Sequence, residues 1–366
     1  MTSIHDKYAH VLTHYCLDVQ PGEKVFIRSS YLAEDLLKAV YRQVLEAGGI
    51  PEVAVSIGDL DRLLLTHGND DQLQHVSPMT EATVNTYDAY LVIRAPFNLK
   101  ELQEVPKDRL SFRQKAMRHI NKTYSERTAN GEMKRCLCDF PTHAGAQEAG
   151  MSLADYERFI YSACHLDKED PVAAWLNVRK EQQAIVDHLN HTETIRYVGN
   201  DIDITFSTKG RTWINSDGRA NMPSGEVFTS PVEDSGNGIV RFSYPAIYMG
   251  HEVEDVRLEV VDGEVVKWTA SRGQDFLDYF FSLEGANRFG EIAIGTNYGI
   301  DRFTKNILFD EKIGGTVHMA LGQSYAQAGG ENESSVHWDM IAEMRDAGEV
   351  YADGQKIYEK GKFLIG

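Results

Sequence analysis

Cysteine is scarce in this sequence, with four residues in a chain of 366. A secreted domain held by disulfides is much denser in cysteine, so this number argues against a disulfide framework. Cys136 and Cys138 are separated by one residue, whereas zinc knuckles and redox loops use a two-residue spacing. We therefore expect reduced thiols that pack in the core, where free cysteine is usually found.

Long hydrophobic runs are also missing. A membrane-spanning helix needs about 20 consecutive apolar residues, and the sequence offers no such stretch. Residues 1–19 alternate charged and apolar side chains, unlike the apolar core of a secretory signal. We therefore expect a cytoplasmic protein with no membrane partner.

Positive charge is in deficit. The chain has 37 lysines and arginines against 55 aspartates and glutamates, which gives a formal net charge of −18. The summed field of such a chain repels phosphates, so a general affinity for nucleic acid or for an anionic membrane is not expected. A cationic ligand suits this charge better.

The N-terminal half lacks a glycine-rich phosphate loop, since neither GxGxxG nor GxxxxGK[ST] follows its first strand. It does alternate strand-like and helix-like segments. Residues 23–29 and 51–57 are β-rich, and 33–49 between them place Leu36, Leu37, Val40 and Val44 on one helical stripe. The apolar run 88–96 is typical of a buried parallel strand. These segments predict a parallel-sheet α/β domain built on right-handed crossovers.

The C-terminal half has a different texture. After a second helical zone, at about 150–190, the sequence turns to short alternating strands punctuated by glycine, and a clear hairpin turns at Asp262-Gly263. The chain length also favours two domains. We predict an N-terminal α/β domain over 1–190, followed over 191–366 by an α+β domain with antiparallel strands that carries the catalytic site.

Five candidate metal ligands lie in the second half, in short segments bounded by turns. They are Glu226, Glu291, His318, His337 and Asp339. In an extended segment, His337 and Asp339 would project from the same face. Three carboxylates and two imidazoles suit zinc, cobalt or manganese, and they suffice for two ions if one carboxylate bridges. The residues alone leave a simpler alternative open, because a His-x-Asp pair is often a surface hydrogen-bonded pair.

Several longer strings in the chain resemble a known family. GEVFTSP at 225–231, the run 284–325, ESSVHWDM at 333–340 and the crossover 20–55 are similar to the thermophilic metal-dependent aminopeptidases, of the aminopeptidase T and aminopeptidase S type. The likeness spans most of the chain. It implies a homodimeric enzyme that pairs through its C-terminal domains and removes N-terminal residues from short peptides with two divalent metal ions.

The resemblance also implies roles for individual residues. It makes the five candidates the metal ligands, with Glu291 as the bridging and catalytic carboxylate. The active-site tyrosine of the family, seven residues after the first histidine, falls on Tyr325, whose hydroxyl could donate a hydrogen bond to the developing oxyanion. A packed core tyrosine is the alternative for this position.

One departure from the family concerns the loop between the two histidines. The 19 positions from His318 to His337 are fewer than in the longer members, which suggests a compact branch. Because this loop lies near the site, the substrate preference of the longer members does not transfer to this chain.

Two other functions use the same scaffold. His318, His337 and Asp339 would alone form the facial triad of a mononuclear non-haem iron ring-cleaving dioxygenase, a class that resembles this family in fold. A silent binding protein would have lost one or more ligands, and none is missing. The presence of both glutamates favours two metals and hydrolysis.

Overall fold

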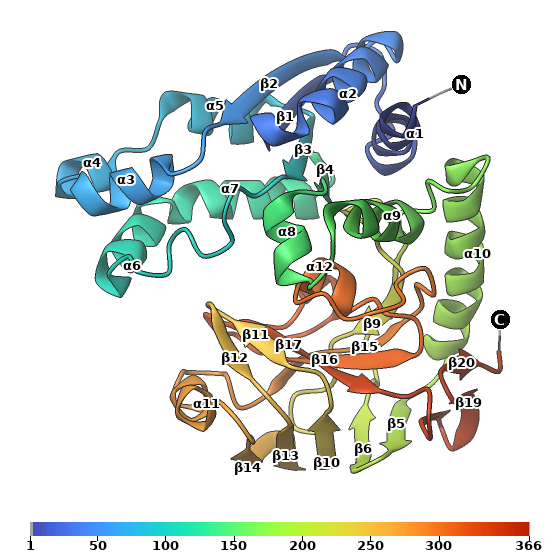
Figure 1. Cartoon of the computed structure of the whole chain (residues 1–366). Coiled ribbons are helices and arrows are strands. Elements are labelled where there is room, and N and C mark those ends of the chain that lie inside the picture. The colour runs from blue at the N-terminus through green and yellow to red at the C-terminus, as the bar shows by residue number, and fades with distance from the viewer. Residues whose placement is uncertain (1–2, 366) are drawn as a thin grey trace. The chain divides into compact units, whose positions relative to one another are not determined.

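The computed structural model describes residues 3–365, and contacts between Cα atoms divide the chain into two compact units (Figure 1). Unit 1 comprises residues 1–172 and 218–223, and unit 2 comprises 173–217 and 224–366. The expected domain boundary at 190 lies at the end of helix α10 (Pro171–Leu189), whereas the contact division lies near its start. The boundary at 190 therefore stays a prediction. In the described part of the chain, no helix has the length and hydrophobicity needed to span a membrane.

Unit 1 is built on a five-stranded parallel sheet in the order β2-β1-β3-β4-β8. Its strands are β1 (Lys24–Ser30), β2 (Ile50–Ser56), β3 (Ala89–Arg94), β4 (Lys134–Asp139) and β8 (Asn221–Met222). The helical segments of this unit are α1 (Ile4–His10), η1 (Val11–Cys16), η2 (Tyr31–Ala33), α2 (Glu34–Glu46), α3 (Leu60–His67), α4 (Asp70–Gln74), α5 (Pro78–Thr86), α6 (Lys107–Ala116), α7 (Arg118–Ala129), α8 (His143–Glu148) and α9 (Leu153–Ala163). The predicted parallel-sheet α/β architecture is confirmed.

Helix α2 shows why this crossover forms. Its predicted stripe of leucine and valine is buried, and the helix packs on β1 and β2. Two glycines then end the helix. Gly48 adopts a φ of +82°, and a Cβ on Gly49 would lie 2.7 Å from a methyl group of Val19 and 2.9 Å from one of Val44. The chain can therefore turn tightly into β2 only with glycine at these positions.

The cysteines behave as predicted. All four are buried thiols outside any disulfide, namely Cys16, Cys136, Cys138 and Cys164. Burial raises the pKa of the Cys164 thiol, which keeps it in the unreactive thiol form. The cysteines therefore contribute packing rather than chemistry.

Unit 2 is mainly antiparallel. Its large sheet has the order β14-β13-β10-β6-β5-β18-β19-β20, and a second sheet has the order β17-β16-β15-β9-β7. The strands of the large sheet are β5 (Thr194–Gly199), β6 (Ile202–Ser207), β10 (Asn237–Phe242), β13 (Val256–Val261), β14 (Glu264–Thr269), β18 (Glu349–Ala352), β19 (Gln355–Glu359) and β20 (Lys362–Phe363). The second sheet contains β7 (Ile214–Ser216), β9 (Glu226–Thr229), β15 (Phe289–Gly295), β16 (Thr316–Gly322) and β17 (His337–Glu343). Unit 2 also contains a small hairpin of β11 (Ala246–Tyr248) and β12 (His251–Val253). Its other short elements are the helices α11 (Gln274–Phe281) and α12 (Ile307–Asp310) and the turn η3 (Ala326–Ala328). The predicted hairpin at Asp262-Gly263 joins β13 and β14.

The antiparallel sheet β17-β16-β15-β9-β7 of unit 2 also has five strands, and the term five-stranded sheet refers to it from here on. One of its faces forms part of the main hydrophobic core. Side chains such as Ile292, Met319 and Trp338 belong to one buried cluster with residues of the eight-stranded sheet, as expected for two sheets packed face to face (Figure 1). Trp338 is 1% exposed and packs against the rings of Tyr248 and Phe280. Since side chains alternate along a strand, the residues between these core positions project from the opposite face.

Candidate metal centre

The five candidate ligands project from that opposite face of the five-stranded sheet. Glu226 begins β9, Glu291 lies in β15, His318 in β16, and His337 and Asp339 in β17. Residues directly opposite each other in an antiparallel pair share a face. Asp339 lies opposite Ala320, and Ala320 lies opposite Glu291. The same rule places Glu226, His318 and His337 on this face. Segments more than 100 positions apart in sequence therefore meet at one point.

Small residues leave room between these side chains. Most direct cross-strand partners of the candidates are small residues, namely Gly295, Ala293, Ala320, Gly322 and Ser216. The larger Ile341 lies opposite His318. A β-bulge between Phe289 and Glu291 also re-aims the glutamate, as bulges commonly do beside functional sites. The small partners therefore let the polar side chains of three neighbouring strands approach one another on one face of the sheet.

The polar atoms converge closely. Nε2 of His318 lies 3.4 Å from Oε2 of Glu226 and 3.7 Å from Oε1 of Glu291. Nε2 of His337 lies 3.2 Å from Oε2 of Glu291 and 3.4 Å from Oδ1 of Asp339. Glu291 is 4% exposed and contacts both imidazoles. This central position is the one that a bridging ligand requires.

The donor atoms fit a divalent cation. Buried polar atoms normally form hydrogen bonds, yet Oε2 of Glu226 and Oδ1 of Asp339 form none among the described residues and have only an imidazole nitrogen at 3.4 Å. Two sets of three side chains have ligand atoms within 4.8 Å of one another, one formed by Glu291, His337 and Asp339, the other by Glu311, His318 and Asp339. Carboxylates and imidazoles of this kind are ordinary zinc, cobalt or manganese ligands.

His337 is oriented by its second ring nitrogen. Nδ1 donates a hydrogen bond to the carbonyl oxygen of Gln323 at 2.7 Å, because a carbonyl can only accept. Nε2 is therefore the nitrogen that faces Glu291 and Asp339. Histidine ligands of metals are commonly oriented through such a backbone carbonyl.

Two charged neighbours of the centre are not predicted from the sequence. Glu311 directly follows α12, and the side chain of Lys312 is 0% exposed. Lys312 Nζ contacts the carboxylate of Glu311 and lies 3.7 Å from Oε1 of Glu226. The available signal was the run of three charges at 310–312 between the apolar residues Phe309 and Ile313, since charge in such a segment is seldom buried without a function.

The close packing of charges shifts the pKa of several groups in the metal-free state. Burial lowers the pKa of His337, but the carboxylates of Asp339 and Glu291 outweigh burial and raise it to about 12. For His318, carboxylates of Glu291 and Glu226 likewise overcome burial and raise the pKa to about 9. Burial raises the pKa of Asp339, and the His337 imidazole reverses this and lowers it to about 2. The imidazoles are therefore protonated at neutral pH and balance part of the carboxylate charge.

Lys312 is a permanent cation in this cluster. Burial lowers the pKa of its amine, but the carboxylates of Glu226 and Glu311 outweigh burial and raise the pKa overall. Burial raises the pKa of Glu311 to about 7, against the lowering effect of Lys312. The ammonium group thus holds two carboxylates that would otherwise repel each other.

Tyr325 lies in the turn between β16 and η3. The centroid of its ring is 5.2 Å from that of His337 and 5.3 Å from that of Phe228, both in edge contact. Its backbone N–H donates to Oγ of Ser230 at 3.0 Å, which fixes the turn. Burial, followed by the Glu291 carboxylate, raises the pKa of Tyr325. The hydroxyl is therefore neutral and can donate a hydrogen bond, and at 37% exposed the residue is open to a ligand.

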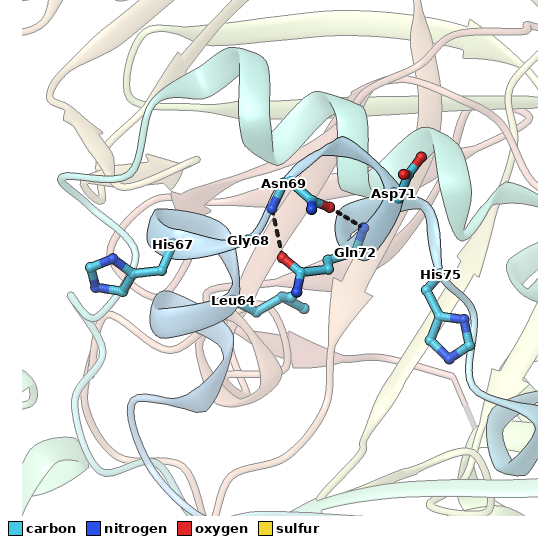
Figure 2. A pocket seen from close by; sticks show the side chains of 7 residues that line it. All are labelled: Leu64, His67, Gly68, Asn69, Asp71, Gln72 and His75. Carbon is cyan, nitrogen blue, oxygen red and sulfur yellow. Dashed lines mark hydrogen bonds between the residues drawn. The ribbon is translucent and has the colours of Figure 1, made fainter.

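A hollow in unit 1 also carries histidines and a carboxylate, but its groups do not converge. It has a volume of about 560 Å³ and is lined by Leu64, His67, Gly68, Asn69, Asp71, Gln72 and His75. Figure 2 shows that His67 and His75 point away from the hollow on opposite sides, while Asn69 and Gln72 form the capping box of α4. This hollow is therefore a helix junction rather than a metal site.

Comparisons with known proteins show the family of the chain. The family model for thermophilic metalloproteases (M29) matches residues 2–363. Aminopeptidase 2 of Geobacillus stearothermophilus is 27% identical over 409 aligned positions, which cover 98% of this chain and 97% of that protein. Aminopeptidase T of Thermus aquaticus is 30% identical over 240 positions, covering 56% of this chain and 58% of the relative. The fold is similar to that of wild-type AmpT from Thermus thermophilus, with a TM-score of 0.84, 22% identity and 99% coverage of both chains.

Proposed function

The chain belongs to the thermophilic metalloprotease family (M29) and is a metallo-aminopeptidase, and we propose that it releases N-terminal residues from short peptides at the centre on the five-stranded sheet. The observation that carries this proposal is the convergence of five ligand side chains on one sheet face, where two buried carboxylate oxygens have no hydrogen-bond partner among the described residues. A divalent cation would satisfy both oxygens.

We propose that the centre would hold two divalent ions. The support is that two groups of ligand atoms lie close together and share Asp339, although the second group contains Glu311 rather than Glu226, and that Glu291 contacts both imidazoles. We assign Glu226, Glu291, His318, His337 and Asp339 as the ligands, with Glu291 bridging, and we propose zinc, cobalt or manganese as the metal. When bound, such ions lower the pKa of a water and polarise the scissile carbonyl.

The residues around the ions supply the rest of the chemistry. We propose that a ligand carboxylate assists the attacking water by accepting its proton, as a general base does. The neutral Tyr325 hydroxyl donates a hydrogen bond to the oxygen that gains negative charge in the transition state, an effect worth about 3 kcal/mol when the donor is preorganised.

The experiment that tests this function combines metal analysis with hydrolysis of amino-acid p-nitroanilides before chelation, after chelation, and after zinc, cobalt or manganese is restored. We expect about two metals per chain and cleavage that depends on them. Glu291→Gln should abolish cleavage and reduce metal content. Glu259→Gln, on the exposed face of β13, is the matched control and should leave both unchanged.

The opposite result would be one iron per chain and no peptidase activity with any metal. That result would favour the ring-cleaving dioxygenase, which needs only His318, His337 and Asp339. The aminopeptidase relatives do not favour this alternative, and it leaves Glu226 and Glu291 without a role.

We also propose a homodimer in the cytoplasm, with residues 191–366 as the catalytic domain. The support is the resemblance to the family and the absence of a spanning helix in the described residues. Light scattering on the purified chain should give twice the monomer mass of 41.2 kDa. A monomeric mass at working concentration would reject the dimer and leave the peptidase assignment unaffected.

A further inference from the structure

A cleft in unit 1 lies at the carboxyl ends of its parallel strands. The chain passes from β1 to β2 on one side and then crosses to β3 on the other side of β1, so the direction of winding reverses at β1. In open α/β sheets, ligands bind outside the carboxyl ends of the strands at such a reversal. The cleft has a volume of about 480 Å³, within the range of small-molecule sites.

The floor of the cleft is fixed by serine hydroxyls that are already engaged. Oγ of Ser29 donates to the carbonyl oxygen of Ile93 at 2.8 Å, and Oγ of Ser30 donates to that of Ala95 at 2.7 Å. These bonds tie the end of β1 to the end of β3. The floor is therefore rigid, and the charged side chains remain for recognition.

Charges of both signs line the cleft without pairing. Arg28, Asp61 and Glu101 all contribute to its wall, yet no ion pair within 4.0 Å joins any two of them in the described part of the chain. Arg94, by contrast, makes two hydrogen bonds to Asp139, at 2.6 and 2.9 Å. A guanidinium and two carboxylates that line one cleft and stay apart match a ligand that carries both charges.

The remaining wall is apolar and uncovered. Ile57 is 61% exposed and Leu60 is 53% exposed, and both line the cleft beside the ring of Phe97. Gly58 lets the loop approach that ring, since a Cβ there would lie 2.9 Å from it. An apolar side chain placed here would remove these surfaces from water, which favours binding.

We propose that this cleft binds a free α-amino acid with an apolar side chain, its carboxylate on Arg28, its ammonium group facing Asp61 and Glu101, and its side chain against Ile57 and Leu60. Arginine suits a carboxylate because its planar donors can bind both oxygens. The site uses none of the residues of the metal centre. If the proposed peptidase function holds, the ligand is a product of the reaction and the cleft is a second place for it to bind.

The test measures binding of L-leucine to the full chain by calorimetry after the metal has been removed with a chelator. We compare L-leucine with 4-methylpentanoate, which lacks the amine, and with leucinamide, which lacks the carboxylate. We expect one saturable leucine per chain and at least tenfold weaker binding of each analogue, because each leaves one charged wall of the cleft unpaired. Arg28→Met should weaken leucine at least tenfold, whereas Arg158→Met, an exposed arginine on α9, should not change it.

Asp61→Asn is the second variant, and it should weaken the binding of leucine but not the binding of 4-methylpentanoate. Circular dichroism and the melting temperature check that each variant folds. The proposal is overturned if leucine binding does not saturate below about 10 mM. A dissociation constant of about 10 mM corresponds to a binding free energy weaker than about −3 kcal/mol. Equal binding to Arg28→Met, or equal binding of leucine and 4-methylpentanoate, would overturn it as well. Hydrolysis of p-nitroanilides by the same preparation after metal is restored reports separately on the peptidase function.

Discussion

At the scale of single residues, Lys312 is the least expected feature of the metal centre. Its side chain is fully buried between Glu226 and Glu311. We predict that Lys312→Met lowers the free energy of unfolding of the metal-free protein by about 3–5 kcal/mol, because it leaves buried carboxylates unpaired. Urea unfolding in chelator measures this. Lys305→Met removes a partly exposed pair with Glu252 and should cost at most about 1 kcal/mol. Equal losses for the two variants would show that Lys312 does not hold the carboxylates together.

The protonation of the two histidines gives a prediction for pH. In the metal-free protein the pKa of His318 is raised to about 9 and that of His337 to about 12, so both imidazoles carry a second proton at pH 7. A metal ion binds only the neutral ring, so binding must release these protons. We expect about two protons released per chain at pH 7, and apparent metal affinity that rises with pH, more steeply below about 9, where both imidazoles lose a proton, than between about 9 and 12, where only His337 does. Calorimetry of zinc binding in buffers of different ionisation enthalpy counts the protons. A proton count of zero would mean that the imidazoles are already neutral.

A substitution at Tyr325 should distinguish metal binding from catalysis. Tyr325→Phe keeps the ring contacts with Phe228 and His337 but removes the hydroxyl. We expect kcat for an amino-acid p-nitroanilide to fall about 100-fold with metal content unchanged, as for the loss of one oxyanion donor. Tyr279→Phe, on the exposed side of α11, is the control. An unchanged kcat would return Tyr325 to the role of a packing residue.

Sequence patterns identified the candidate ligands but missed Glu311 and Lys312 for a physical reason. Alternation along β17 places His337 and Asp339 on one face, and this can be read from two positions in the sequence. Glu311 instead arrives through the turn after α12, whose path depends on long-range contacts such as the bond from the N–H of Asn297 to the carbonyl of Lys312. A run of charged residues in the sequence does not indicate which buried groups its side chains will contact.

At the scale of elements, the small residues of the five-stranded sheet hold the space in which a metal would lie. Ala320 is fully buried and pairs with both Glu291 and Asp339. We predict that Ala320→Val fills part of this space and lowers metal content below one ion per chain, at a cost of about 1–3 kcal/mol in stability. Elemental analysis and thermal unfolding measure the two effects. Ala342→Val, on the core face of β17, should lose similar stability but keep its metal.

Some elements and pairings can be predicted from the local sequence, and others cannot. The segments β1, α2, β2 and β3 follow from local periodicity, and so does the hairpin of β13 and β14. The pairing of β5 with β18 joins residues 195–198 to 349–352, and nothing local specifies it. Such pairs form because each strand has an apolar face to bury, and many strands satisfy that condition equally well.

At the scale of the whole molecule, the net charge of −18 sets a long-range field that favours cationic substrates. We predict that KM for the dipeptide amide Leu-Lys-amide rises about threefold between 20 and 300 mM salt, while KM for Leu-Glu-amide falls, because salt screens attraction and repulsion alike. Leu-Gly-amide is the control and should change least. The measurement is initial-rate hydrolysis with saturating metal, and kcat should stay constant for each peptide because screening acts on encounter rather than on the chemical step. Parallel KM changes for all three peptides would mean that salt acts on the metal centre itself, and the steering field would then have no part in substrate choice.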